Sequence, residues 1–399
     1  MSKEKSSRIF AKFFEQTGAS AVLLNDPNSV SCCTGLEFPF ATHFPEKPLG
    51  YLFSKNASSL LICPYEWTQA VLDQGWTGGV RSYDDQNADP FAYLAEQTAD
   101  FLKTVFGTGE AGKERAKGKP VAVVGLEGQY ISAAFQQDLD EACPDLQWVD
   151  TGQLLRDVRM IKDKREIELL RTSAEKLEFG LIGALQHLEG SLEENGYTLP
   201  EFCERIRVHV YETGGTAGGI AAAPAGRGGT VWYGLPRGKF APGELIRIEA
   251  SSRYMGYWAY TSRMMTIGEA TDIQKRAYRE NLLLKERVVE MLSPGVKASN
   301  IFETVEELAA AEGIDFRPEF GVGHGIGTAE MEAPYLIPSD ETVLREGMCI
   351  VVAVYTEGPG KELVCSKDTY CIQSGDPQCV SWYHNWEELY EVTGFRSAH

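Results

Sequence analysis

Short apolar runs separated by turn residues dominate the first third of the chain, and one helical pattern interrupts them. Apolar and β-branched residues in runs of four to eight favour strands, and a strand that runs into a glycine turn favours burial. This region therefore predicts a small α/β domain. Its predicted elements are strands over 21–24, 50–53, 59–63 and 119–125, a turn over 25–28, and a helix over 89–107.

Longer helical patterns appear after Leu155, where apolar residues recur three and four positions apart between opposite charges. We expect one charged helix over 159–181 to connect two domains, which divide the chain into residues 1–155 and 156–399. The predicted class is α/β (α+β). The other predicted elements of the second domain are helices over 199–213, 272–292 and 298–312 and strands over 245–251, 256–267, 348–355 and 363–372.

Composition and charge indicate which kinds of partner the protein can bind and in which cellular compartment it works. The chain has 399 residues, 38 lysines and arginines and 57 aspartates and glutamates, giving a formal charge of −19. Such a surface repels phosphate backbones and anionic lipids, so neither nucleic acid nor a membrane is expected as a partner. The nine cysteines include no C-x-x-C pair, and residues 1–18 are amphipathic, not a secretory signal. We therefore expect a cytoplasmic protein with reduced cysteines.

Four segments in the second domain together resemble the creatinase/methionine-aminopeptidase superfamily. Their order and spacing match over residues ~155–375, and the first domain is similar to the creatinase-like N-terminal domain. The resemblance implies a pita-bread catalytic domain. The four segments are MIKDKREIELLRTSAE (160–175), PGELIRIEASSRYMGYWAYTSRMMTIG (242–268), GVGHGIGTAEMEAP (321–334), and REGMCIVVAVYTEGPG (345–360) with SKDTYCI (366–372).

The resemblance implies a two-metal site in this superfamily, but most of its ligand positions hold unsuitable residues. Divalent cations at such sites need oxygen ligands and an imidazole. One ligand is kept, one is changed conservatively and three are lost, so we expect no metal and no cofactor. Met331 stands where the superfamily has a second catalytic histidine. The five ligand positions are Glu249, Tyr260, His324, Ala353 and Lys367.

The chain is also similar to the metal-free ectoine hydrolases of this superfamily, over its whole length and in WYGLPRGKF (232–240). This resemblance implies hydrolysis of the cyclic amidine of ectoine to N-acetyl-2,4-diaminobutyrate, with hydroxyectoine as a further candidate substrate. A cationic amidine carbon is already electrophilic and suits carboxylates and aromatic faces better than a metal. Two alternatives remain: a creatinase-like hydrolase of another amidine or guanidine, and a non-catalytic binding module.

Candidate site residues follow from the same positions. Glu249 is the expected nucleophile or general base, and His324 is expected to protonate the departing nitrogen. Alternatively, Glu249 pairs with Arg247 or Arg253, and Lys367 pairs with Asp368. Creatinase-like assembly implies a homodimer in which the loop over 37–48 reaches the partner's site. The candidate substrate-binding residues are Trp232, Tyr233, Tyr260, Glu332, Glu357 and His43.

Overall fold

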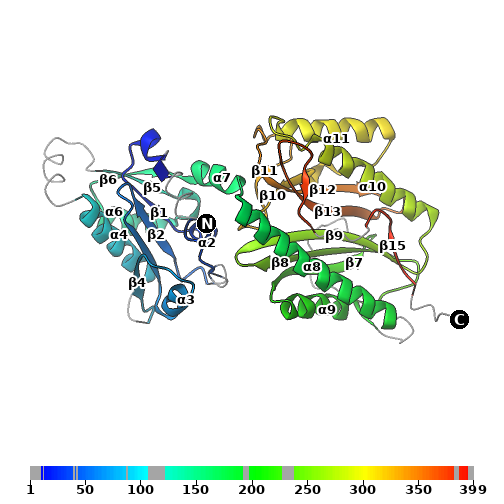
Figure 1. Cartoon of the computed structure of the whole chain (residues 1–399), viewed down its shortest axis with the longest axis horizontal. Helices are drawn as coiled ribbons and strands as arrows, with labels where there is room; N and C mark the ends of the chain where they lie inside the picture. Colours follow the sequence, from blue (N-terminus) through cyan, green and yellow to red (C-terminus); the bar gives the residue numbers. More distant parts are fainter. Residues whose placement is uncertain are drawn as a thin grey trace. The chain divides into compact units, whose positions relative to one another are not determined.

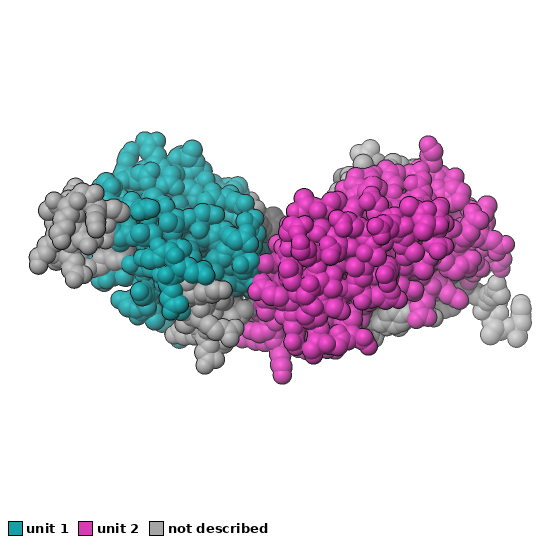
Figure 2. Space-filling view, turned by 90° about the horizontal axis from the view of Figure 1, so that it is seen from above, with its two compact units in different colours: residues 1–159 teal, residues 160–399 magenta. Residues whose placement is uncertain are grey.

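The chain forms two compact units, residues 1–159 and 160–399 (Figure 2). A computed structural model describes residues 10–11, 13–38, 41, 44–86, 89–106, 122–191, 197–226, 238–381 and 386–393. Within these ranges no helix combines the length and the apolar character that crossing a bilayer requires.

Unit 1 is built on a six-stranded mixed sheet with the order β4-β3-β2-β1-β5-β6 (Figure 1). Neighbouring strands β1, β2 and β3 are antiparallel, whereas β1–β5, β3–β4 and β5–β6 are parallel. The strands are β1 Ala21–Leu24, β2 Gly50–Ser54, β3 Ser59–Pro64, β4 Gly79–Tyr83, β5 Ala122–Leu126 and β6 Leu146–Asp150. Its helical segments are α2 Pro27–Thr34, η2 Tyr65–Trp67, α3 Thr68–Asp73, α4 Pro90–Phe106, η3 Gly128–Tyr130, α6 Ala133–Ala142 and α7 Gly152–Met160, the last ending at the unit boundary.

The predicted strands and the helix over 89–107 are confirmed where the structure describes them, residues 107 and 119–121 lying outside it, but the predicted turn over 25–28 is wrong. Asp26 is instead the N-cap of helix α2, and its side chain accepts a hydrogen bond from the backbone N–H of Asn28 at 3.1 Å. Pro27 occupies the first turn, where its missing N–H costs nothing. An Asp-Pro pair begins both turns and helices, so the pattern alone favoured the wrong one.

Unit 2 carries a larger mixed sheet whose main path runs β11-β10-β12-β13-β9-β8-β7, with β14 beside β13 and β15 beside β9. The strands are β7 Thr216–Pro224, β8 Leu245–Tyr254, β9 Tyr257–Ile267, β10 Gly323–Gly325, β11 Glu332–Tyr335, β12 Cys349–Glu357, β13 Leu363–Cys371, β14 Gln378–Cys379 and β15 Tyr390–Val392. Its helical segments are α8 Lys164–Ser191, α9 Leu199–Glu212, α10 Asp272–Met291, η4 Pro318–Phe320 and α11 Ala298–Glu312. The predicted helices and strands of this unit are confirmed to within a few residues at their ends.

The single charged helix expected after Leu155 is two helices, α7 and α8. Between them Ile161 pairs with Met348, and the N–H of Lys162 donates to the carbonyl of Gly347 at 2.8 Å. Asp163 and Glu166 then cap α8 reciprocally, each side chain accepting from the other's backbone N–H at 2.9 and 2.7 Å. A capping box inside a continuous charged pattern is hard to see by periodicity alone.

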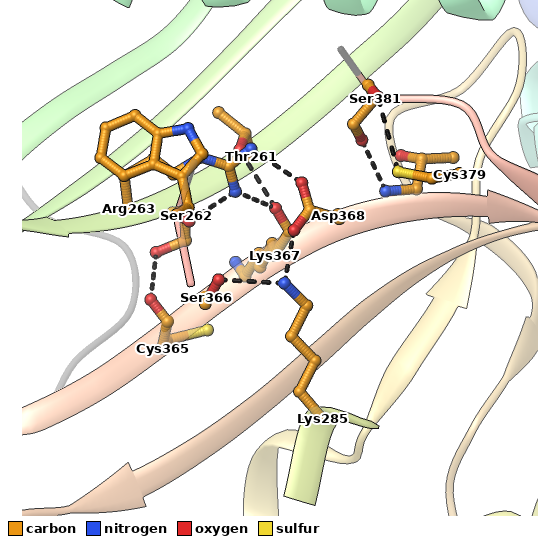
Figure 3. A network of polar contacts seen from close by, with 12 residues as sticks. Thr261, Ser262, Arg263, Lys285, Cys365, Ser366, Lys367, Asp368, Cys379 and Ser381 are labelled. Atoms are coloured by element: carbon orange, nitrogen blue, oxygen red, sulfur yellow. Dashed lines mark hydrogen bonds and ion pairs between the residues drawn. The ribbon is translucent and has the colours of Figure 1, made fainter. Parts of the chain in front are cut away.

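Strand β13 places the side chains of Lys367 and Asp368 on opposite faces of the sheet, because successive strand side chains point in opposite directions. Asp368 lies on the face covered by helices α8 and α10, where Arg263 donates to it at 2.7 Å and Lys285 of α10 also pairs with it (Figure 3). Arg263 also reaches Glu178 of α8 at 2.5 Å. These four side chains form the buried ionic network, which ties two helices to the sheet.

The two carboxyl groups of the buried ionic network, those of Asp368 and Glu178, have pKa values shifted in opposite directions. Burial opposes ionisation of Asp368, but the charges of Arg263 and Lys285 outweigh it and hold the pKa of Asp368 below its usual range. Burial raises the pKa of Glu178, which Arg263 offsets only in part. Asp368 is therefore the ionised centre on which both cations depend.

Replacing Arg263 by leucine should destabilise unit 2 strongly, because two buried carboxylates lose their shared cation. Breaking a buried ion pair from one side costs about 3–5 kcal/mol. Urea unfolding followed by tryptophan fluorescence measures the loss. The control is Arg276→Leu on α10, which removes an exposed arginine paired with Glu280 at 3.5 Å and should change the free energy of unfolding by less than about 0.5 kcal/mol. Equal effects from the two substitutions would show that the network does not hold the helices to the sheet.

Candidate functional site

A cluster of polar side chains lies on the face of the unit 2 sheet opposite the buried ionic network. Strand pairing sets Glu249 opposite Ser262, Ser262 opposite Lys367, and Lys367 opposite Ala353. Residues paired directly across antiparallel strands share a face, and so do residues two apart along one strand. This register brings the side chains of β8, β9, β12 and β13 together at one place.

Lys367 is the centre of this cluster. Its side chain is 2% exposed, and its Nζ donates to Glu249 Oε2 and to the hydroxyl of Tyr260, both at 2.7 Å. Nζ also lies 4.0 Å from the centroid of the Tyr260 ring and 5.1 Å from that of Tyr355. A buried ammonium is thus held by one carboxylate, one hydroxyl and two aromatic faces. Lys367 and Asp368 do not pair with each other.

Both carboxylate oxygens of Glu249 are occupied. Oε2 accepts from Lys367, and Oε1 accepts from the Tyr355 hydroxyl at 3.2 Å and lies 3.7 Å from Nε of Arg247. The alternative partner, Arg253, instead lies over the Trp258 ring. A carboxylate bonded at both oxygens is a weaker nucleophile than a bare one, because attack would break these contacts. The geometry therefore gives Glu249 the role of holding Lys367.

His324 is neutral and presents one ring nitrogen as an acceptor. Its Nδ1 lies 2.9 Å from the carbonyl oxygen of Gly325, which can only accept, so Nδ1 carries the hydrogen and Nε2 the lone pair. Burial, helped by the charge of Lys367, lowers the pKa of His324 to about 4 against the opposing effects of the Gly325 hydrogen bond and the charge of Glu332. The ring stacks beside Tyr260 with centroids 6.0 Å apart. His324 is therefore poorly suited to protonate a leaving group near neutral pH.

Two members of the cluster were missed by the sequence analysis. Tyr355 lies two residues after Ala353 on β12, and strand alternation could have placed it on the same face. Glu330 lies in the loop between β10 and β11 and forms a hydrogen bond with Ser251. The charge of Lys367 lowers the pKa of Glu330, and the charge of Glu249 raises it. No periodicity in this loop signals where its side chain points.

The other predicted site residues either pair with side chains outside the cluster or lie outside the described residues. Glu332 pairs with Lys162 at 2.7 Å, and its charge acts on His324. Glu357, at the end of β12, pairs with Arg317. The structure therefore gives both glutamates protein partners outside the cluster. Trp232, Tyr233 and His43 lie outside the described residues.

The residues at the implied ligand positions do not fit a two-metal centre. The described residues contain no group of three or more histidine, cysteine, aspartate or glutamate side chains that could hold a metal ion. The ammonium of Lys367 bonds directly to Glu249 and would repel a cation placed there. Ala353 and Tyr260 supply no carboxylate. The cluster therefore carries its own fixed cation at the position that the resemblance assigns to a metal ligand.

Relatives with named activities are similar to this chain over most of its length. The Xaa-Pro dipeptidase of Lactobacillus delbrueckii subsp. lactis is 25% identical over 355 residues, which cover 87% of this chain and 89% of the relative. The solved Xaa-Pro dipeptidase from Bacillus anthracis has a TM-score of 0.77 at 18% identity, covering 98% of this chain and 100% of its own. The solved X-Pro aminopeptidase from Thermotoga maritima MSB8 has a TM-score of 0.76 at 19% identity, and the match covers 95% of this chain and 99% of the aminopeptidase chain.

These relatives overturn the function expected from the sequence. The expectation that the chain hydrolyses ectoine is wrong, because the relatives are named as peptidases of Xaa-Pro substrates and not as amidine hydrolases. The same names do not favour the alternatives of a creatinase-like amidine hydrolase or a non-catalytic module. The lost metal ligands had directed the expectation towards metal-free members of the superfamily.

Two family profiles together span nearly the whole chain. The creatinase/prolidase N-terminal domain matches residues 9–161. Metallopeptidase family M24 matches residues 168–380, more than half of the chain, and this match includes every described member of the cluster. The solved structures cited above have the same two-domain fold as this chain. The chain is therefore a member of metallopeptidase family M24 that carries a creatinase/prolidase-type N-terminal domain.

Proposed function

We propose that the chain hydrolyses the peptide-type C–N bond of a small, dipeptide-like substrate, and that Lys367 polarises the carbonyl of that bond. The observation that supports this most is the state of the Lys367 ammonium. It is buried, charged and fixed by Glu249 and Tyr260. The names of the relatives, Xaa-Pro dipeptidase and X-Pro aminopeptidase, support the substrate class.

Lys367 has one donor left for a substrate. An ammonium carries three N–H donors, and within the described residues Glu249 and Tyr260 accept two of them. The third can donate to a carbonyl oxygen. When water attacks that carbonyl, negative charge develops on the oxygen, and a preorganised cation in a water-poor site stabilises it strongly. Here this charge comes from the protein chain itself.

His324 is the acceptor that can orient the attacking water. Its Nε2 lone pair is set by the bond from Nδ1 to the carbonyl of Gly325. In the proposed reaction the water oxygen bonds to the carbonyl carbon, the C–N bond breaks, and both protons of the water end on the departing nitrogen. One water is consumed, and a carboxylate and an ammonium are formed. Because the pKa of His324 is about 4, its part is to position the water rather than to store the proton.

Replacing Lys367 by methionine should abolish this hydrolysis. The protein should stay folded when Glu249 is replaced by glutamine at the same time. Removing a group that stabilises developing charge typically costs 10²–10³-fold in kcat. The single change leaves Glu249 buried without its ammonium, so the double variant Lys367→Met/Glu249→Gln removes both charges and tests activity without an unpaired charge. The measurement is release of free amino acid from a panel of Xaa-Pro and other dipeptides. Lys164→Met, at an exposed position of α8, is the control and should keep wild-type rates.

A wild-type protein that cleaves no dipeptide, or a folded double variant that retains wild-type turnover, would refute the proposal. The two results differ in meaning: the first rejects the substrate class, and the second rejects the role of Lys367.

Activity should not depend on a divalent metal, because the ammonium of Lys367 already supplies the positive charge beside Glu249. We expect less than one equivalent of manganese, cobalt or zinc per chain by elemental analysis, and unchanged rates after treatment with a chelator. Lys367→Glu should act in the opposite sense, since it places a carboxylate beside Glu249 and should raise the affinity for Mn²⁺ in calorimetry. One or two bound metal ions together with activity lost on chelation would contradict this prediction.

The protein should lose stability as the pH falls from about 6.5 towards 4, in part because of His324. Its folded pKa of about 4 lies below the value near 6.5 of an unperturbed histidine, so in this window the unfolded chain binds the extra proton. His324→Gln should reduce the slope of unfolding free energy against pH over this range. The measurement is urea unfolding at pH 5 and pH 7. An unchanged slope would mean that His324 is not held neutral by the fold.

A further inference from the structure

Cys349 and Cys371 lie directly opposite each other on strands β12 and β13. The carbonyl of Cys349 accepts from the N–H of Ile326, which follows β10, at 3.2 Å, so this carbonyl points away from β13. The bond between the two strands is made one residue away, where the N–H of Ile372 donates to the carbonyl of Met348 at 2.8 Å. The two cysteines therefore form a non-hydrogen-bonded pair, the kind in which opposite side chains lie closest.

This pairing already has the backbone geometry that a disulfide requires. In a non-hydrogen-bonded antiparallel pair the Cα atoms lie about 4.5 Å apart, and a disulfide spans Cα separations of about 4.4–6.8 Å. The thiols of Cys349 and Cys371 are free, they are in hydrogen-bond contact, and their residues are 0% and 1% exposed. A bond between the two sulfur atoms would therefore need little movement of either strand.

The surroundings make the two thiols unequal. The S–H of Cys349 donates to Cys371, and this bond lowers the pKa of Cys371. The charges of Lys162 and Arg171 also lower it, against the effect of burial. The same bond and burial raise the pKa of Cys349. Cys371 is therefore the thiol that ionises first, and the thiolate is the reactive form of cysteine.

Cys371 lies close to the surface of unit 2, although its own side chain is covered. Strand β13 ends at Cys371, and residues 374–376 are exposed. Arg171 and Glu346, whose charges act on the Cys371 thiol, both reach solvent. Local opening at the end of a strand costs much less free energy than unfolding of the domain. A small oxidant can therefore reach Cys371 from the strand end.

We propose that Cys349 and Cys371 form a redox site that a peroxide, such as hydrogen peroxide, oxidises to a disulfide. The Cys371 thiolate attacks one peroxide oxygen, the O–O bond breaks, and the departing hydroxide takes up a proton to leave as water. Cys371 is then a sulfenic acid. The Cys349 sulfur attacks the Cys371 sulfur, the S–O bond breaks, and the second oxygen leaves as water with the Cys349 proton. Two thiols and one peroxide give one disulfide and two waters.

The disulfide would join β12 to β13, the two strands that carry Tyr355 and Lys367. It closes the loop between residues 349 and 371 and so restricts the unfolded chain more than the folded one. Oxidised wild type should therefore unfold at a higher urea concentration than reduced wild type, and dithiothreitol should reverse the difference. This site is independent of the proposed peptide hydrolysis.

Peroxide treatment of the full-length protein tests the site. Non-reducing digestion and mass spectrometry with fragmentation should recover the peptides of Cys349 and Cys371 joined, and dithiothreitol should separate them. Cys349→Ala should leave the sulfenic acid on Cys371, where dimedone traps it, whereas Cys371→Ala should give no dimedone adduct at Cys349. The control is Cys203→Ala, which removes a fully buried thiol of α9 and should keep the linked peptide.

Exposed Met255 reports whether the peroxide dose was sufficient, because its sulfur is open to oxidation. Recovery of Cys349 and Cys371 as free thiols in folded wild type, at a dose that converts Met255 to its sulfoxide, would overturn the proposal. Linkage of either cysteine to a different partner would also overturn it. A dimedone adduct at Cys349 in place of Cys371 would refute the order of attack. Circular dichroism before and after treatment establishes that the protein stays folded.

Discussion

Two consecutive charges on strand β13 organise unit 2, because each must be neutralised on its own face of the sheet. Asp368 is buried against α8 and α10 and requires Arg263 and Lys285. Lys367 is buried on the other face and requires Glu249. Arg263 also donates to the carbonyl of Lys367 at 2.6 Å, so the buried ionic network fixes the backbone that carries the ammonium. Misplacing this strand by one residue would exchange the two faces and separate Asp368 from Arg263 and Lys285, and Lys367 from Glu249.

The position of Lys367 changes the chemistry available to an M24 fold. A divalent metal brings charge, open coordination positions and bound water, whereas an ammonium brings charge and three directed donors. It can stabilise an oxyanion but cannot lower the pKa of a bound water. The proposed reaction must therefore orient the water with other groups, and His324 is neutral and placed to do so, although its low pKa does not suit it to keep the proton. This difference limits the proposed reaction to substrates whose carbonyl can approach the ammonium closely.

Four glutamates of unit 2 show how environment decides the role of one residue type. Glu332 is satisfied by Lys162, and Glu357 by Arg317. Glu249 is held at both oxygens by Lys367 and Tyr355. Glu330 retains an oxygen without a donor among the described residues. The first two pair with basic side chains outside the cluster, the third positions the ammonium, and the fourth has a buried oxygen without a donor in the described part of the chain.

The sequence by itself determined the two-domain architecture and most helices and strands of both domains. These follow from local periodicity and from motifs that lie within short segments. Only the tertiary structure decided the partners of each charge. It set Lys367 against Glu249 rather than Asp368, took Glu332 and Glu357 out of the cluster, and brought in Tyr355 and Glu330. Those contacts join residues about a hundred positions apart, such as Glu249 and Lys367, and depend on strand order and register, which no local pattern specifies.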